Sequence, residues 1–311
     1  MKARLFAIIL AALLLMAIPV RAGIYYVTVA GLGGEPDYEQ EFTQLASNLD
    51  KLLKSSNPDA HVYTLTDATR AQMTQVLAKV ASAAKPNDDF VLILIGHGTF
   101  DGFQYKFNLV GPDITADEIA KLCDQIQSKR QLIVNTTEAS GGSVAVLQRR
   151  GRAVIAATKD GNEKNATVFA RYFVQALHDP EADLDKNNAI SAMEAFEYAQ
   201  RHTADFYDSQ KRLATEHAIF EDTGEHQPVR AASTDTGEGL FLSNFTLIRL
   251  GSLQEAYNNP AKRTLLAQKE DLERKIDTLK YQKAAMPQDE YKQQLTQALL
   301  ELAKVQEQLD K

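Results

Sequence analysis

Two short stretches of the sequence combine reactive side chains with glycine, and each follows an apolar run. His97 lies between two glycines directly after the apolar residues 91–95. A second apolar run, 131–135, leads into a turn of small polar residues at 135–140 that ends in two glycines. An imidazole beside a hydroxyl or thiol is the arrangement that general-base and covalent catalysis requires. Because the carboxyl ends of neighbouring parallel strands meet at one sheet edge, we expect His97 to face this turn.

A third stretch, residues 183–194, has oxygen-bearing side chains at the spacing of an EF-hand calcium loop. The ligands that this spacing predicts are the side chains of Asp183, Asp185, Asn187 and Glu194 and the backbone carbonyl of Ala189. Asn188 stands where glycine is usual, and asparagine is the next most tolerant of a left-handed backbone. The alternative is an acidic turn that only caps the next helix, since Ser191 and Glu194 form a capping-box pair. We expect calcium here, with weak to intermediate affinity, because only three carboxylates contribute.

Alternating strand and helix patterns must position these stretches. Runs of β-branched, aromatic and other apolar residues predict strands at 24–30, 61–65, 91–95, 131–135 and 152–158. Apolar residues at helical spacing predict helices at 38–54, 69–83, 115–128, 144–149, 167–177 and 191–201. Such alternation is typical of an α/β fold: a twisted, mostly parallel sheet with helices on both faces. We expect residues 240–250 to form a last strand or an extended strip on the core.

The first 22 residues have the pattern of a secretory signal peptide. Lys2 and Arg4 precede the apolar run 5–20, and a small-residue site ends at Ala22. The apolar run is shorter than the ~20 residues that a membrane span needs. We therefore expect cleavage after Ala22, no stable membrane span, and a secreted or periplasmic protein. An uncleaved anchor is the alternative.

A globular domain at 23–250 is expected to be followed by a different kind of segment at 252–311. This segment has ten basic and ten acidic residues, and two amphipathic helices meet at Pro287. The pattern predicts an antiparallel α-helical hairpin. The hairpin either packs on itself or the core, or it forms a homodimer or docks a partner.

Charge and cysteine content narrow the function classes. The formal net charge of the chain is -7, which gives no support for a nucleic-acid partner. The chain has one cysteine, Cys123, so no internal disulfide can form. Cys123 lies in a helical pattern with apolar neighbours, and we expect it to be buried as a small hydrophobic residue.

The order of strand, Gly-His-Gly, helix, strand and small-residue turn resembles the caspase-like fold, most closely the legumain-like branch of cysteine peptidases. The resemblance covers residues 24–250. In that family the histidine after the third strand is the general base, and a cysteine after the fourth strand is the nucleophile. His97 matches the first position and Thr137 the second, or Thr136 or Glu138 if the register shifts by one. The resemblance implies catalytic positions at His97, Thr137 and Gly98, and substrate-binding positions at Asn135, Ser140, Asp160 and Glu163.

Threonine in place of cysteine changes the chemistry that the resemblance implies. A thiol beside an imidazole ionises readily, whereas a hydroxyl does not, so its loss costs on the order of 10³-fold or more in rate. We therefore expect an exported, catalytically silent peptidase-fold protein that binds a peptide or protein. One alternative is an active endopeptidase that uses His97 with Thr137 or Ser140 as a hydroxyl nucleophile. Another is a scaffold protein that acts through residues 252–311.

Overall fold

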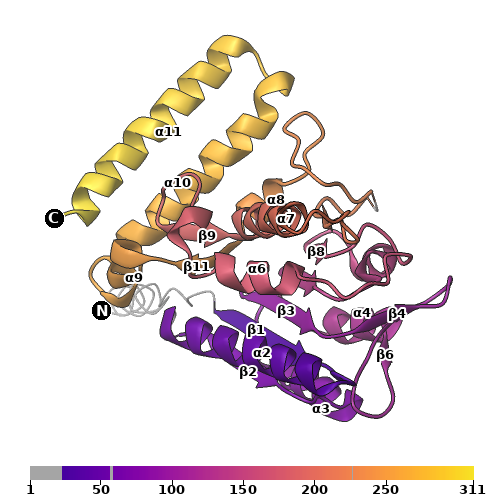
Figure 1. Ribbon diagram of the computed structural model, residues 1–311. Helices are drawn as coiled ribbons and strands as arrows, with labels where there is room; N and C mark the ends of the chain where they lie inside the picture. Colours follow the sequence, from indigo (N-terminus) through magenta and orange to yellow (C-terminus); the bar gives the residue numbers. More distant parts are fainter. Residues whose placement is uncertain (1–22, 57–58, 226) are drawn as a thin grey trace, which may run out of the picture.

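A six-stranded sheet is the centre of the part of the chain that the computed structural model describes, residues 23–56, 59–225 and 227–311 (Figure 1). In chain order its strands are β1 (Ile24–Ala30), β2 (His61–Leu65), β3 (Asp89–Ile95), β7 (Arg130–Asn135), β8 (Arg152–Ala156) and β10 (Ile219–Glu221). Their order across the sheet is β10-β8-β7-β3-β1-β2. Every neighbouring pair is parallel except β10 with β8. The predicted signal peptide lies outside the described residues.

Helices cover both faces of this sheet (Figure 1). They are α2 (Pro36–Ser56), α3 (Arg70–Ala83), α4 (Ala116–Asp124), α5 (Val144–Leu147), α6 (Phe169–Ala176) and α7 (Ala192–Ser209). Along β3, Val91, Ile93 and Ile95 pack in the core with α2, α6 and α7. The alternate residues of β3 pack in a second core with α3, α4 and α5. The predicted α/β class, with helices on both faces of a mostly parallel sheet, is therefore confirmed.

Two small sheets flank the central one. β4 (Gly98–Phe100), β5 (Tyr105–Phe107) and β6 (Ile114–Thr115) form an antiparallel sheet that begins directly after His97. The other pairs β9 (Ala189–Ser191) with β11 (Thr246–Arg249). The single strand or strip predicted at 240–250 is instead the short helix α8 (Leu240–Ser243) followed by β11. Gly239, with φ +99°, redirects the backbone so that α8 can start.

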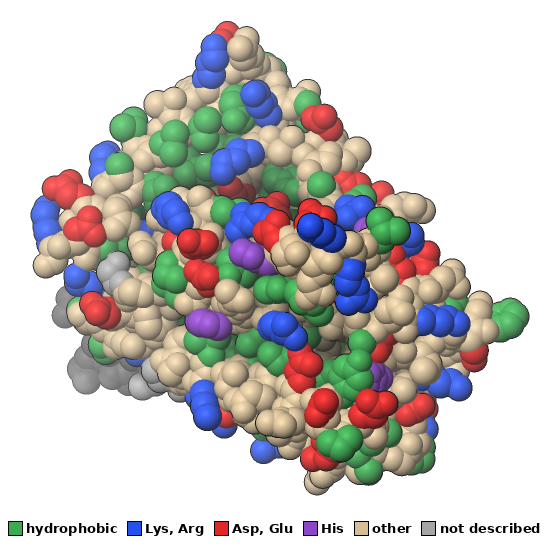
Figure 2. Space-filling model, in the orientation of Figure 1, with side chains coloured by type: hydrophobic (Ala, Val, Ile, Leu, Met, Phe, Trp, Pro, Cys, Tyr) green, Lys and Arg blue, Asp and Glu red, His purple; other side chains and the backbone are tan. Residues whose placement is uncertain are grey.

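The chain ends in an α-helical hairpin, as predicted (Figure 1). Its helices are α9 (Gly251–Asn258), α10 (Arg263–Gln282) and α11 (Gln288–Leu309), and the 3₁₀ turn η3 (Lys283–Ala285) follows α10. Two further 3₁₀ turns, η1 (Ser140–Ser143) and η2 (Pro180–Ala182), lie in the globular part. α10 is tied to the globular part: Arg249 Nε donates to Glu270 at 2.7 Å. Figure 2 shows apolar side chains gathered on the hairpin above the body, with charged side chains around them. None of the described helices combines the length and apolar character that crossing a bilayer requires.

Candidate functional site

The end of β3 and the turn after β7 lie side by side, as the sequence predicts. The two strands pair in parallel, with Leu94 opposite Asn135. His97 therefore leaves the sheet next to the turn 135–140. The prediction that these two strand ends are adjacent is confirmed.

The imidazole of His97 meets a hydrogen-bond acceptor at each ring nitrogen. Nδ1 lies 2.6 Å from Glu138 Oε1, and Nε2 lies 3.1 Å from the carbonyl oxygen of Gly33. The rings of Tyr38 and Phe42, from α2, stand edge-on to the imidazole at 4.8 and 5.0 Å between centroids. The ring is thus fixed in position and orientation from three sides.

These contacts determine the protonation of His97. A carbonyl oxygen can only accept, and a carboxylate accepts as well, so the two contacts together favour the imidazolium form of His97, in which both ring nitrogens carry a proton. The hydrogen bond to Glu138 raises the pKa of His97, against the opposing effect of burial. An imidazolium with both N–H groups engaged has no free lone pair. In this state His97 cannot accept a proton as a general base.

The raised pKa of His97 predicts a pH-dependent contribution to stability. The pair contributes fully below the unfolded-state pKa of about 6.5, and its contribution is lost as pH rises through the higher folded-state pKa. We expect the free energy of unfolding to fall across this window and His97→Gln to flatten the fall.

Glu138→Gln should lower the free energy of unfolding by about 1–3 kcal/mol at pH 6, because it leaves the partly buried imidazolium of His97 without its anionic partner. Urea unfolding at pH 5.5–8.5 measures both effects. His178→Gln, at an exposed helix end, is the control, and an unchanged pH profile in His97→Gln would count against the ion pair.

Thr137 lies in the same turn but faces away from the imidazole. Its hydroxyl is fully buried and bonds Tyr105 Oη at 2.6 Å, Asn135 Oδ1 at 2.9 Å and the Glu138 carbonyl at 2.9 Å. No hydrogen bond joins it to His97 among the described residues. Thr137 thus closes a buried hydrogen-bond network beneath the turn.

Gly98 permits the close approach of the two strand ends. A Cβ at this position would lie 2.4 Å from Thr137 Oγ1 and 2.6 Å from the carbonyl oxygen of Glu138. The N–H of Gly98 donates to Glu138 Oε2 at 3.1 Å. The carboxylate of Glu138 therefore receives the His97 ring and the next backbone amide together.

Three of the four predicted substrate-binding residues have their side-chain polar atoms engaged in the loops. Asn135 is fully buried, and its amide donates to Ser143 Oγ at 3.1 Å. Ser140, also fully buried, accepts from the backbone N–H of Thr158 at 3.1 Å. Asp160 is half-buried and accepts from the N–H of Asn162 at 2.7 Å. These bonds fix the loops that surround His97.

Glu163, the fourth, forms a second carboxylate–histidine pair close to the first. Its side chain bonds His217 Nδ1, and Oε2 accepts from the backbone N–H groups of Lys159 and His217 at 2.9 and 3.0 Å. The carbonyl of Glu163 accepts from the N–H of Ala139 at 2.8 Å, in the turn that faces His97. The two pairs are therefore connected through one backbone hydrogen bond.

The sequence pattern indicates Glu138 only as an alternative register for Thr137, and it does not indicate His217. Glu138 carried one usable signal, a carboxylate among small residues where a buried strand ends. Its side chain is about nine-tenths buried there, which a carboxylate tolerates only when paired. His217 is 54 residues from Glu163 and lies in no recognisable spacing.

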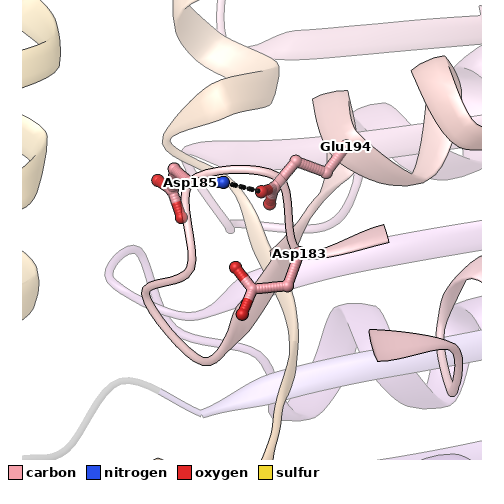
Figure 3. Close-up of side chains that lie close together, drawn as sticks. All are labelled: Asp183, Asp185 and Glu194. Carbon is pink, nitrogen blue, oxygen red and sulfur yellow. Dashed lines mark hydrogen bonds between the residues drawn. The ribbon is translucent and has the colours of Figure 1, made fainter. Parts of the chain in front are cut away.

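The acidic loop brings its three carboxylates together, as Figure 3 shows. One oxygen from each of Asp183, Asp185 and Glu194 lies within 4.8 Å of the others. Asp183 also accepts from the backbone N–H groups of Asn187 and Asn188, at 3.1 and 3.0 Å, which curls the loop around it. Asn188 has φ +66°, the left-handed conformation for which its residue type is suited.

Glu194 caps α7 and also faces the acidic loop. Oε2 accepts from the N–H and hydroxyl of Ser191, each at 2.8 Å, which completes a capping box on α7. Oε1 faces the loop and accepts from the N–H of Leu184 at 2.9 Å. Burial raises the pKa of Glu194, and that of Asp185 as well, where the nearby Asp183 adds to the effect. Capping of α7 by Glu194 is therefore compatible with the hypothesis that Glu194 also binds calcium.

Secondary structure on two sides holds this loop. β9, which contains Ala189, pairs with β11, and Ile190 lies opposite Ile248. From α10, Lys269 donates through Nζ to the carbonyl of Asn187 at 3.1 Å. The loop is thus anchored to both the globular part and the hairpin.

No protein-family model matches the sequence, and no curated protein matches it. Among solved structures, the chain is similar to a protein from Geobacter sulfurreducens at 14% identity and a TM-score of 0.43, covering 66% of this chain and 94% of that one. The Drosophila initiator caspase Dronc matches at 13% identity and a TM-score of 0.43, with 68% and 82% covered. Raptor of Chaetomium thermophilum matches at 10% identity and a TM-score of 0.39, with 52% of this chain and 18% of that chain covered.

Proposed function

We propose that this protein is an exported, catalytically silent relative of the caspase-like and legumain-like peptidases that binds a peptide or protein beside His97. The observation that carries the proposal is the engagement of both His97 ring nitrogens by acceptors, Glu138 and Gly33. A peptidase of this type needs an ionisable thiol at the ring nitrogen that is not otherwise engaged, so that thiol and imidazole can form the reactive pair. Here the carboxyl group of Glu138 lies beside the ring in place of a thiol.

The nearby hydroxyl groups favour a catalytically silent protein over an endopeptidase that uses a hydroxyl nucleophile. Thr137 and Ser140 are both fully buried, and the hydroxyl of each is hydrogen bonded to groups other than His97. A nucleophile must contact both its base and the substrate. Either residue would have to break its present hydrogen bonds and reach the surface before it could attack a peptide.

Fluorogenic peptides that contain Asn or Asp test the proposal directly. We expect no turnover above background with or without calcium. Cleavage that disappears in both His97→Gln and Thr137→Val would overturn the silent assignment and favour the hydroxyl nucleophile.

Binding is tested separately with labelled, uncleaved peptides of the same sequences in fluorescence polarisation. Lys159 borders the Glu163–His217 pair, and its side chain is half-exposed. Lys159→Ala should weaken binding about three- to tenfold, the loss of one charged contact. Lys51→Ala, on the exposed side of α2, is the matched control. If no peptide binds, the proposal that the protein binds a peptide beside His97 is overturned.

We further propose that the acidic loop at 183–194 holds a calcium ion. The favourable observation is the convergence of the Asp183, Asp185 and Glu194 oxygens within 4.8 Å of one another. Calcium takes six to eight oxygen ligands. Asn187, the Ala189 carbonyl and water would complete such a set. The ion would neutralise carboxylates that otherwise repel one another, so its role would be to stabilise the loop and the start of α7.

A further inference from the structure

A cavity of about 250 Å³ lies on the far side of the Glu163–His217 pair, between α7 and the segment that leads into β10. Its lining includes Arg201, Thr203, His217 and Arg230. Gln200, on α7, donates through Nε2 to the carbonyls of Ala218 and Arg230, at 3.3 and 3.1 Å. These bonds join the walls, so the cavity is preformed. Its volume suits a small ligand, since pockets for drug-sized ligands span roughly 300–1,000 Å³.

The hydroxyl of Thr203 is an unpartnered polar group in this lining. The residue is 5% exposed, and Oγ1 has no hydrogen-bond partner among the described residues. A helical threonine ordinarily bonds the carbonyl one turn earlier, and a buried polar group without a partner costs free energy. A ligand in the cavity would supply the missing partner.

The lining also contains two arginine side chains, Arg201 and Arg230. Among the described residues, neither Arg201 nor Arg230 has a carboxylate oxygen within the 4.0 Å of an ion pair. Arg201 lies over the ring of Tyr198, at 5.6 Å to its centroid. Two unpaired guanidinium groups at one cavity favour a planar or tetrahedral oxyanion, which each can bind through paired N–H groups.

His217 adds a directed group to the same wall. Its Nδ1 is held by Glu163, whereas Nε2 has no partner among the described residues, and the side chain is 30% exposed. A carboxylate that fixes one ring nitrogen orients the other. Glu216, beside it, also belongs to the lining. Its carboxylate already accepts from the N–H groups of Val168 and Phe169 and from the Tyr207 hydroxyl, at 2.8, 3.2 and 3.0 Å.

We infer that this cavity binds the oxyanion group of a small ligand, a carboxylate or a phosphate. Arg201 and Arg230 would bind the charge, while Thr203 and the Nε2 of His217 would contact the remaining oxygens. Neither the acidic loop nor the surroundings of His97 contribute to this lining. The lining shares only His217, the partner of Glu163, with the surroundings of the peptide-binding surface proposed above.

Calorimetric titration of the full chain with acetate and with inorganic phosphate tests the inference, at constant ionic strength in a zwitterionic buffer. Binding of acetate alone assigns the carboxylate class, and binding of phosphate alone or of both assigns an oxyanion site open to phosphate. Arg201→Gln and Arg230→Gln should each weaken binding about five- to tenfold, whereas Arg212→Gln, outside the lining, should not. No heat of binding from either anion up to tens of millimolar would overturn the inference, as would equal affinity in all variants.

Thr203→Val separates ligand binding from a structural role. The substitution keeps the shape of the side chain and removes the unpartnered hydroxyl. We expect an unchanged or higher melting temperature together with affinity reduced about three- to tenfold. A lower melting temperature with unchanged affinity would show that the hydroxyl has a partner within the fold and would overturn its role as a ligand contact.

Discussion

Calcium at about a hundredfold excess over its dissociation constant is expected to raise the free energy of unfolding by about 2.7 kcal/mol. For a domain of this size, that corresponds to a rise of about 5–10 °C in melting temperature. Asp185→Asn should lose most of this gain, because one of the three converging carboxylates is removed. Differential scanning calorimetry with calcium, with magnesium and with a chelator measures the effect.

The same variant has an opposite expected effect without calcium. Three carboxylates within 4.8 Å repel one another, so Asp185→Asn should melt at the same temperature as the parent protein, or higher, in chelator. Asp185 is a better choice than Glu194, whose loss would also remove the capping box of α7. Asp208→Asn, at the exposed far end of α7, is the matched control. A parent protein whose melting temperature is the same in calcium and chelator would end the calcium proposal.

A thiol at position 138 is expected to react with iodoacetamide at pH 6 at least about tenfold faster than a thiol at position 137. The variants are Glu138→Cys and Thr137→Cys. Glu138 faces the His97 ring, so a thiol there would lie close enough for the imidazolium to lower its pKa and populate the thiolate. The lower nucleophilicity of a low-pKa thiolate offsets part of the gain. A thiol at 137 would be buried against Tyr105 and Asn135.

The protein provides its own background control for this experiment. Cys123 is fully buried, and burial raises its pKa to about 11, so it should remain unmodified at pH 6. Adding His97→Gln to Glu138→Cys should abolish the acceleration. Faster alkylation at 137 than at 138 would mean that Thr137, and not Glu138, faces the imidazole, and the basis for the silent assignment would be lost.

Local patterns in the sequence predicted much of the fold. β1 and β2 coincide with the predicted strands, because each is a β-branched or aromatic run bounded by turn residues. Helix α3 begins after the Thr69 capping box and α7 after that of Ser191, signals contained within four residues. The curled shape of the acidic loop is likewise specified within twelve consecutive residues. In each case the stabilising contacts are near in sequence.

The sequence patterns did not predict the elements whose stability depends on partners far away in the sequence. β10 has three residues and exists only because β8 offers it an edge with which to pair. The small sheet β4-β5-β6 extends directly from the Gly-His-Gly turn, where the sequence predicted only a strand end. The stretch 240–250 divides into α8 and β11, since β9 pairs with only its second half.

The sequence by itself determined that an imidazole and a polar turn leave adjacent parallel strands at one sheet edge, because strand order and apolar runs fix where strands end. It also determined that no thiol is available in that turn. Only the tertiary structure decided that Glu138 and not Thr137 contacts His97, and that the carbonyl of Gly33 takes the second ring nitrogen. A side chain's direction in a tight turn depends on which neighbour occupies the space beneath it. Here Tyr105 and Asn135 hold the threonine hydroxyl inside, which leaves the carboxylate to neutralise the histidine.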